Sequence, residues 1–162
     1  MYLLFNNKIF INIILSAIVL LLQAYSPRIP LGENLEFSLD FLLVFITISV
    51  LLNKTFVVIF IAFFLGLVQD CLINIEAIGL CSFSKSLCAY YISKVKLNNN
   101  LWSTYFKQFY VFLIYFIHFM FYYFILELNI NAIILLSSFL HSLFAIFIFY
   151  IINKFLFNSK LL

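Results

Sequence analysis

The stretch AFFLGLVQDCLINIEAIGL, from Ala62 to Leu80, places an aspartate at the end of a long apolar run. An ionisable group beside a membrane segment is costly unless other groups satisfy it, so Asp70 needs partners. Ala62, Gly66 and Asp70 recur every four residues and therefore share one face of a helix. Small residues on such a face allow a second helix to approach closely. The pattern predicts a membrane helix whose small-residue face leads to a carboxylate.

The composition of the whole chain agrees with this interpretation. The 162 residues are 67% hydrophobic and only 9% charged, and the mean hydropathy is +1.20. Soluble domains are far more polar, so we expect an integral membrane protein. A membrane span needs about 20 mostly apolar residues, and a chain of this length holds about five or six of them. No room remains for a soluble catalytic domain.

Apolar runs divide the chain into six segments. We therefore predict one all-α domain over residues 1–162, a polytopic membrane protein folded as a compact bundle of six transmembrane helices, with five as the alternative count. The second segment is the weakest prediction, because its 16 residues extend only about 24 Å as a helix. The predicted spans cover residues 9–24, 37–52, 56–71, 78–95, 105–128 and 130–157.

The distribution of charge favours six spans over five. Basic residues near helix ends are retained on the cytoplasmic side of a membrane. With six spans and both termini inside, seven of the nine basic residues fall inside: Lys8, Lys54, Lys94, Lys96, Lys107, Lys154 and Lys160. Arg28 and Lys85 are the exceptions. All six acids fall at the outer ends or loops: Glu33, Glu36, Asp40, Asp70, Glu76 and Glu127. The net charge of +3 is thus a topology signal, and we expect no nucleic-acid partner.

Polar side chains within the spans follow helical spacing and predict seams between helices. Small and hydroxyl-bearing residues on one face permit close packing and hydrogen bonds across it. Such stripes occur in four spans: Asn12, Ser16 and Gln23; Ser82, Ser86, Ala89 and Ser93; Tyr115, His118 and Tyr122; and Ser138, His141, Ser142 and Ala145.

The sequence offers no pattern that indicates an enzyme, a metal or a cofactor. His118 and His141 have no second ligand at helical spacing, so we expect each to be hydrogen-bonded within the bundle. Cys71, Cys81 and Cys88 form no CxxC pair and are expected to act as small apolar residues. No phosphate loop or hydrolase motif occurs. We therefore expect a protein that is not an enzyme and that carries no cofactor.

Several roles are open to Asp70 at this point. Its carboxylate can cap the turn that follows, accept backbone N–H groups, or pair with Lys85 as the fourth span returns. It can also help to dock a partner. Gly79 suits a positive φ in a tight outer turn, together with Asn74 and Glu76.

In length and span order, nearly the whole chain resembles the rod shape-determining protein MreD family. The similarity lies in a short first span, the loop Ser26-Pro27-Arg28-Ile29-Pro30, and then GLVQD, a polar turn, IGL and the pair Ala89-Tyr90. It is most specific from Gly66 to Tyr90. Gly66, Asp70 and Gly79 match recurrent family positions, and Asp40 matches the polar position that opens the second span. The sequence departs from the family at Leu39, where a proline is frequent, and at Ala62, where a glycine is usual.

The resemblance implies a non-enzymatic scaffold of the bacterial inner membrane. Such a protein binds the bitopic protein MreC within the elongation complex that directs lateral peptidoglycan synthesis, near a wall-synthesis polymerase and a transpeptidase. We expect a partner's single span to pack in a small-residue groove, with polar contacts setting its register. The candidate residues for packing or partner binding are Asp40, Ala62, Gly66, Asp70, Gly79 and Lys85, and the serine stripe of the fourth span is a second candidate groove.

A second class of function is also compatible with six short spans. Small membrane subunits of vitamin importers bind their substrate within a helix bundle of this size. The low glycine content and the absence of a proline-broken span disfavour transport, because substrate sites commonly lie at helix interruptions. Polar stripes that surround a cavity would indicate an importer subunit, and stripes packed against other helices would indicate a scaffold.

Overall fold

The structure is a computed structural model that describes residues 2–27, 29–30, 36–37, 39–73, 77–127 and 132–157. Some residues of the predicted topology lie outside the described part of the chain. They are Arg28, Glu33, Asn74, Glu76 and Lys160, together with the side chains of Lys8, Glu36 and Glu127.

The described residues form six helices and one short two-stranded sheet. In chain order these are α1 (Tyr2–Ala24), β1 (Ile29–Pro30), β2 (Glu36–Phe37), α2 (Phe41–Leu52), α3 (Thr55–Ile73), α4 (Leu80–Leu97), α5 (Thr104–Glu127) and α6 (Ala132–Phe157). Each helix coincides with one predicted segment. The prediction of an all-α bundle of six helices is confirmed.

The second helix is shorter than predicted. The segment predicted for residues 37–52 forms a helix only from Phe41, because Phe37 pairs with Ile29 in the antiparallel β1–β2 sheet. Asp40 then caps the helix: its Oδ1 accepts a hydrogen bond from the Leu43 amide at 2.9 Å. With 12 residues, α2 is about 18 Å long, which is less than the hydrocarbon core of a bilayer.

Within the described residues, three helices are long and apolar enough to cross a membrane. They cover Thr55–Ile73 in α3, Thr104–Ile125 in α5 and Ala132–Phe157 in α6. The serines and lysines of α4 make that helix more polar than these three, and α2 is too short to belong with them. The three long apolar helices indicate a membrane protein.

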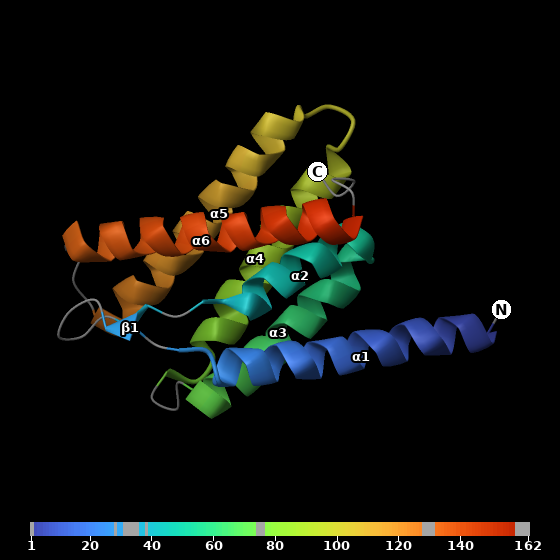
Figure 1. Ribbon diagram of the computed structural model, residues 1–162, viewed down its shortest axis with the longest axis horizontal. Coiled ribbons are helices and arrows are strands. Elements are labelled where there is room, and N and C mark those ends of the chain that lie inside the picture. Colours follow the sequence, from blue (N-terminus) through green and yellow to red (C-terminus); the bar gives the residue numbers. More distant parts are fainter. Residues whose placement is uncertain are drawn as a thin grey trace.

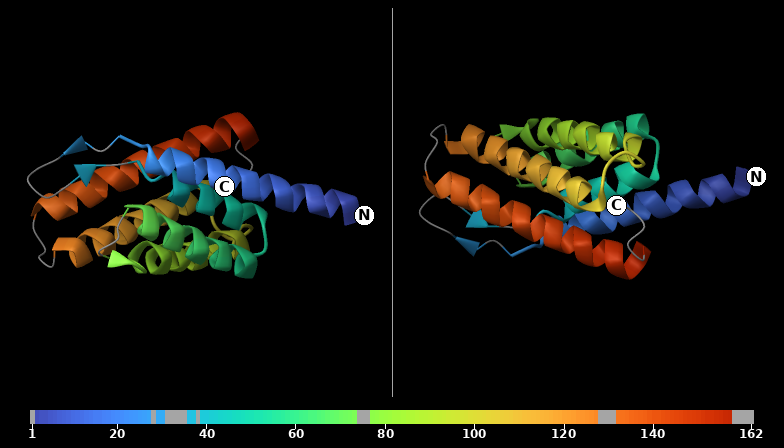
Figure 2. Two further views of the ribbon diagram at one scale, coloured as in Figure 1. Left: turned by 90° about the horizontal axis from the view of Figure 1, so that it is seen from below. Right: turned by 90° about the horizontal axis from the view of Figure 1, so that it is seen from above.

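The helices pack around α2. Every residue of α2 from Leu42 to Thr47 is buried, so this helix is covered on all sides. Figure 1 shows α3 running alongside it, with α4 behind and α6 crossing in front. The amino-terminal part of α1 extends past the remaining helices, as both views in Figure 2 show. The core lies where α2, α4, α5 and α6 meet.

Most of the predicted polar seams are buried. In α4, Ser82, Ala89 and Ser93 are buried and Ser86 is half-buried, while all four stripe residues of α6 are buried. Tyr115 and His118 of α5 are buried as well. The α1 stripe differs, because Asn12 is exposed and only Gln23 is buried. The side-chain Oε1 of Gln23 accepts a hydrogen bond from the Phe41 amide at 2.8 Å, which ties α1 to the start of α2.

Candidate functional site

The small-residue face of α3 packs directly on α4. Ala62 and Gly66 are buried, and a Cβ built on Gly66 would lie 2.5 Å from the Cα of Ser82. No side chain fits at that distance from backbone. Gly66 is therefore required for α3 and α4 to approach as closely as they do. The face of α3 that carries Ala62 and Gly66 is thus a helix-packing face.

Asp70 completes the same seam by capping α4 from a neighbouring helix. Its Oδ2 accepts hydrogen bonds from the amides of Gly79 at 3.0 Å, Cys81 at 3.1 Å and Ser82 at 3.3 Å. A helix begins with unpaired N–H groups and a partial positive charge, so a carboxylate there is strongly stabilised. Gly79 has the expected positive φ, at 101°. The predicted capping role of Asp70 is confirmed.

The two grooves expected to hold a partner are therefore used inside the chain. The Ala62, Gly66 and Asp70 face and the serine stripe of α4 are both buried, and they contact each other at Gly66 and Ser82. We correct the expectation that either face is an open groove. The sequence predicted close helix packing correctly, but α4 itself is the helix that packs there.

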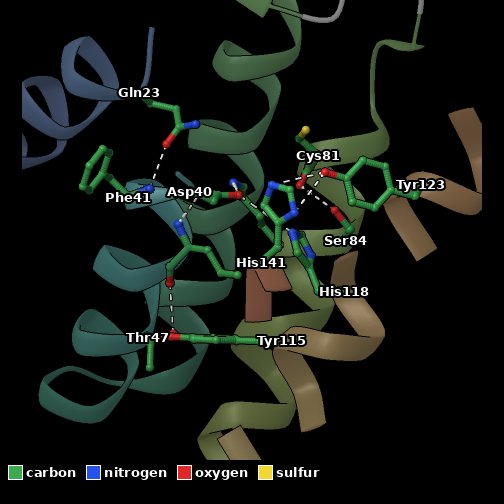
Figure 3. Close-up of polar contacts among 12 residues, drawn as sticks. Gln23, Asp40, Phe41, Thr47, Cys81, Ser84, Tyr115, His118, Tyr123 and His141 are labelled. Atoms are coloured by element: carbon green, nitrogen blue, oxygen red, sulfur yellow. Dashed lines mark hydrogen bonds and ion pairs between the residues drawn. The ribbon is translucent and has the colours of Figure 1, made fainter. Parts of the chain in front are cut away.

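Lys85 pairs with Asp40 and not with Asp70, which corrects one alternative left open by the sequence. Its Nζ lies 2.5 Å from Oδ2 of Asp40, and the Lys85 side chain has no exposed surface. Asp40 is 11% exposed and uses its other oxygen to cap α2. The pair joins the start of α2 to α4, and Figure 3 shows Asp40 between the helices. A buried charge with no partner would cost several kcal/mol, about 3–5, so each member depends on the other.

His118 of α5 is the third member of this cluster. Its Nε2 lies 3.9 Å from Oδ2 of Asp40, close enough for electrostatic attraction but too far for a good hydrogen bond. Its Nδ1 is buried and has no hydrogen-bond partner among the described residues. Only one other buried side-chain atom in that part of the chain, Oε1 of Gln69, shares this property. Such atoms are rare and call for an explanation.

A groove between α4 and α5 includes His118 in its lining. It has a volume of about 390 Å³ and is lined mainly by apolar side chains, with His118 and Ser84 among the few polar ones. Leu87 and Tyr91 of α4 and Leu113 and Ile117 of α5 also line it and are exposed. From Tyr110 to Phe121 it follows α5 for about 16 Å. It is an apolar surface groove with a polar group near one end.

The remaining polar groups of the core bond to one another. Tyr115 and Thr47 share a hydrogen bond at 2.7 Å between α5 and α2. His141 is hydrogen-bonded as predicted: Nδ1 lies 3.0 Å from the Ser137 carbonyl, and the Tyr123 hydroxyl lies 3.2 Å from its ring nitrogens. Figure 3 shows these contacts close to the Asp40 cluster. The Tyr123–His141 contact joins α5 to α6, and the Thr47–Tyr115 hydrogen bond joins α5 to α2.

Sequence reasoning placed Asp40 and Lys85 among the site residues but missed His118 as their neighbour. The stripe of Tyr115, His118 and Tyr122 put His118 on a buried face, although nothing in it indicated which helix faces that stripe. Among the described residues, no group of three His, Cys, Asp or Glu side chains is arranged to hold a metal ion. The three cysteines are present as thiols, and those of Cys81 and Cys88 are buried.

Comparison of the chain with protein-family models, with curated proteins and with solved structures gives no match.

Proposed function

We propose that this protein is a non-enzymatic membrane scaffold that binds the single span of a partner inside the bilayer. In this proposal six helices cross the bacterial inner membrane, both termini are cytoplasmic, and the chain acts in the rod complex. The resemblance of Gly66 to Tyr90 to the MreD family supports the cellular role. It also suggests the partners: an MreC-like bitopic protein and, through it, a wall-synthesis polymerase and transpeptidase.

One observation carries the binding role. Most buried polar side chains serve to hold the bundle together, whereas Nδ1 of His118 has no partner among the described residues and His118 lines the open α4–α5 groove. A polar atom in hydrocarbon favours a partner that satisfies it. Because Nδ1 is buried in the unbound chain, a hydrogen-bonding side chain of the partner would reach it as the His118 ring turns toward the groove, and this contact would fix the register of the partner span.

The shape of the groove suits a helix that brings small residues to it. Leu87, Tyr91, Leu113 and Ile117 are exposed apolar residues of its lining, and small side chains on a partner span would let that span pack closely against them. Lipid provides no hydrophobic drive for helix association, so close van der Waals contact must stabilise the complex. The proposal therefore assigns the partner site to α4 and α5, since α4 covers the small-residue face of α3.

The importer subunit remains the second candidate, and the same groove favours it. A volume of about 390 Å³ lies within the usual range for small-molecule pockets. In that case Ser84 and His118 would contact the substrate. The alternative predicts a bound small molecule and an associated ATPase, whereas the scaffold predicts a bound membrane protein.

Affinity purification in mild detergent from the source bacterium tests the proposal, with proteins and small molecules both identified by mass spectrometry. The scaffold predicts recovery of a bitopic protein. Ile117→Trp, at a groove residue that is 54% exposed, should reduce that recovery at least about tenfold, an effect of about 1.4 kcal/mol. The matched control is Ile133→Trp, at a residue that is 56% exposed on α6 and lies outside the groove.

Two results would reject the assignment. Equal recovery from Ile117→Trp and Ile133→Trp would remove the α4–α5 groove as the partner site. Recovery of an ATPase pair with a stoichiometric small molecule would make the protein an importer subunit.

A further inference from the structure

The lysines gather at one end of the bundle. This basic end is where α2, α4 and α6 finish and α3 and α5 begin. Apart from Lys85, every lysine whose side chain the structure describes lies there: Lys54, Lys94, Lys96, Lys107 and Lys154. Asp40 and Asp70, the two acids with described side chains, lie toward the opposite end. The basic end therefore attracts anions.

A second groove opens at this end, between α5 and α6. Figure 1 shows that the two helices cross and diverge toward the start of α5. The groove has a volume of about 520 Å³ and is lined by Leu143, Phe144, Phe147, Tyr150, Asn153 and Gln108, among others. From Leu143 to Asn153 it follows α6 for about 15 Å. The lining is mainly apolar, and Gln108 and Asn153 lie toward the basic end.

Lys154 is the lysine placed to serve this groove. It follows Phe147 by seven residues and Tyr150 by four, so it lies on the same face of α6 as the groove lining. Its side chain is exposed, and among the described residues it has no hydrogen-bond or ion-pair partner. The ammonium group of Lys154 therefore lies at the basic end of the apolar α5–α6 groove.

Other lysines of the basic end are engaged within the chain. Lys96 donates to the Asn53 carbonyl at 2.7 Å, and Lys107 is buried and donates to Asn99 at 2.6 Å. Lys94 lies 5.1 Å from the centre of the Tyr90 ring. These contacts explain the position of three lysines without a ligand. Lys54 and Lys154 have no such contact among the described residues, and of these two Lys154 lies on the face of α6 that carries the groove lining.

We propose that the α5–α6 groove binds one anionic phospholipid. One acyl chain lies along Leu143, Phe144 and Phe147, the amide of Gln108 hydrogen-bonds the glycerol ester region, and Lys154 pairs with the phosphate. The bilayer supplies the ligand at high concentration, and basic pockets between membrane helices select anionic headgroups. The site does not depend on the α4–α5 groove or on the proposed partner.

Native mass spectrometry of the full-length protein tests this lipid site. The protein is purified in detergent and exposed to phosphatidylglycerol or to phosphatidylcholine with the same acyl chains. We expect phosphatidylglycerol to be retained preferentially, and Lys154→Gln to weaken its binding about fivefold, the effect of one lysine near a lipid headgroup. Lys54→Gln is the matched control, because Lys54 is also exposed at the basic end but lies at the start of α3.

Filling the groove provides a second variant. Leu143→Trp occupies the space of the acyl chain at an exposed position, so it should reduce retention of the lipid without unfolding the bundle. Equal retention of both lipids by the unmodified protein would overturn the proposal, as would equal losses from Lys154→Gln and Lys54→Gln. Loss from Leu143→Trp with none from Lys154→Gln would show an unselective apolar surface and would also overturn it.

Discussion

Two aspartates cap the starts of two helices in this protein, and the two caps differ. Asp70 reaches from α3 to the start of α4, and its carboxylate accepts hydrogen bonds from three backbone amides. Asp40 caps its own helix, α2, with one oxygen and holds the Lys85 ammonium with the other. The first carboxylate closes a seam between consecutive helices. The second joins elements 45 residues apart in the sequence.

The region around Asp70 is tightly packed, whereas the region around Asp40 contains a polar atom that has no hydrogen-bond partner among the described residues. Around Asp70, Gly66 leaves no space between α3 and α4, and the carboxylate accepts hydrogen bonds from the backbone amides at the start of α4. Around Asp40, a lysine and a histidine converge on one oxygen, and the histidine keeps a nitrogen without a partner among the described residues, beside a groove. We therefore expect damage at the first region to change packing and damage at the second to change charge balance.

Lys85→Met should have the largest effect. It leaves the Asp40 carboxylate buried without its cation, which destabilises proteins by about 3–5 kcal/mol. Unfolding in detergent or bicelles measures this loss. Lys96→Met is the control, because Lys96 is exposed and should lose less than about 1 kcal/mol. Equal losses from the two variants would remove the ion pair as a determinant of the fold.

Gly66→Ala should rank second, at about 1–3 kcal/mol, since the added Cβ forces α3 and α4 apart. Phe64→Leu is the matched control on α3, because Phe64 is 61% exposed and faces away from the seam. A Gly66→Ala protein of unchanged thermal stability would show that the seam is wider than the structure has it.

Asp70→Asn should cost less, about 1–2 kcal/mol, because the amide oxygen still accepts while the charge is lost. The effect should be local. Hydrogen exchange at the Cys81 and Ser82 amides should accelerate, and exchange at the Leu43 amide, which Asp40 caps, should not. Uniform acceleration across all three amides would contradict a cap confined to α4.

Tyr115→Phe should have the smallest effect, about 0.5–1.5 kcal/mol. The Thr47 hydroxyl loses one bond but keeps its hydrogen bond to the Leu43 carbonyl at 2.9 Å. A loss of stability as large as that of Lys85→Met, measured by the same unfolding assay, would contradict this ranking. It would show that the Thr47–Tyr115 pair stabilises the fold as much as the Asp40–Lys85 pair does.

The sequence predicts local features of this fold well, because they depend on neighbouring residues. Apolar runs locate all six helices, and Gly79 is recognised as a positive-φ position before α4. The pattern of Ala62 and Gly66 predicts a close helix contact. The predicted start of α2 is wrong by four residues because Phe37 is apolar in the sequence but pairs in the β1–β2 sheet.

Long-range pairing is what the sequence leaves undetermined. Asp40 and Asp70 lie on the same predicted side of the membrane, so charge alone cannot assign Lys85 to either one. The choice depends on how α2 and α3 lie relative to α4, which no local pattern encodes. For the same reason the identity of the helix that covers Gly66, and the neighbour of His118, emerge only from the packed structure.

A double-mutant cycle between Asp40 and Lys85 tests most directly whether this ion pair organises the junction of α2, α4 and α5. Asp40→Asn keeps an acceptor for the Leu43 amide while removing the charge, and Lys85→Met removes the cation. The free energies of unfolding of the two single variants and the double variant give the coupling. We expect a coupling of at least about 2 kcal/mol, with the double variant more stable than either single one. Additive losses would contradict the central role of the pair.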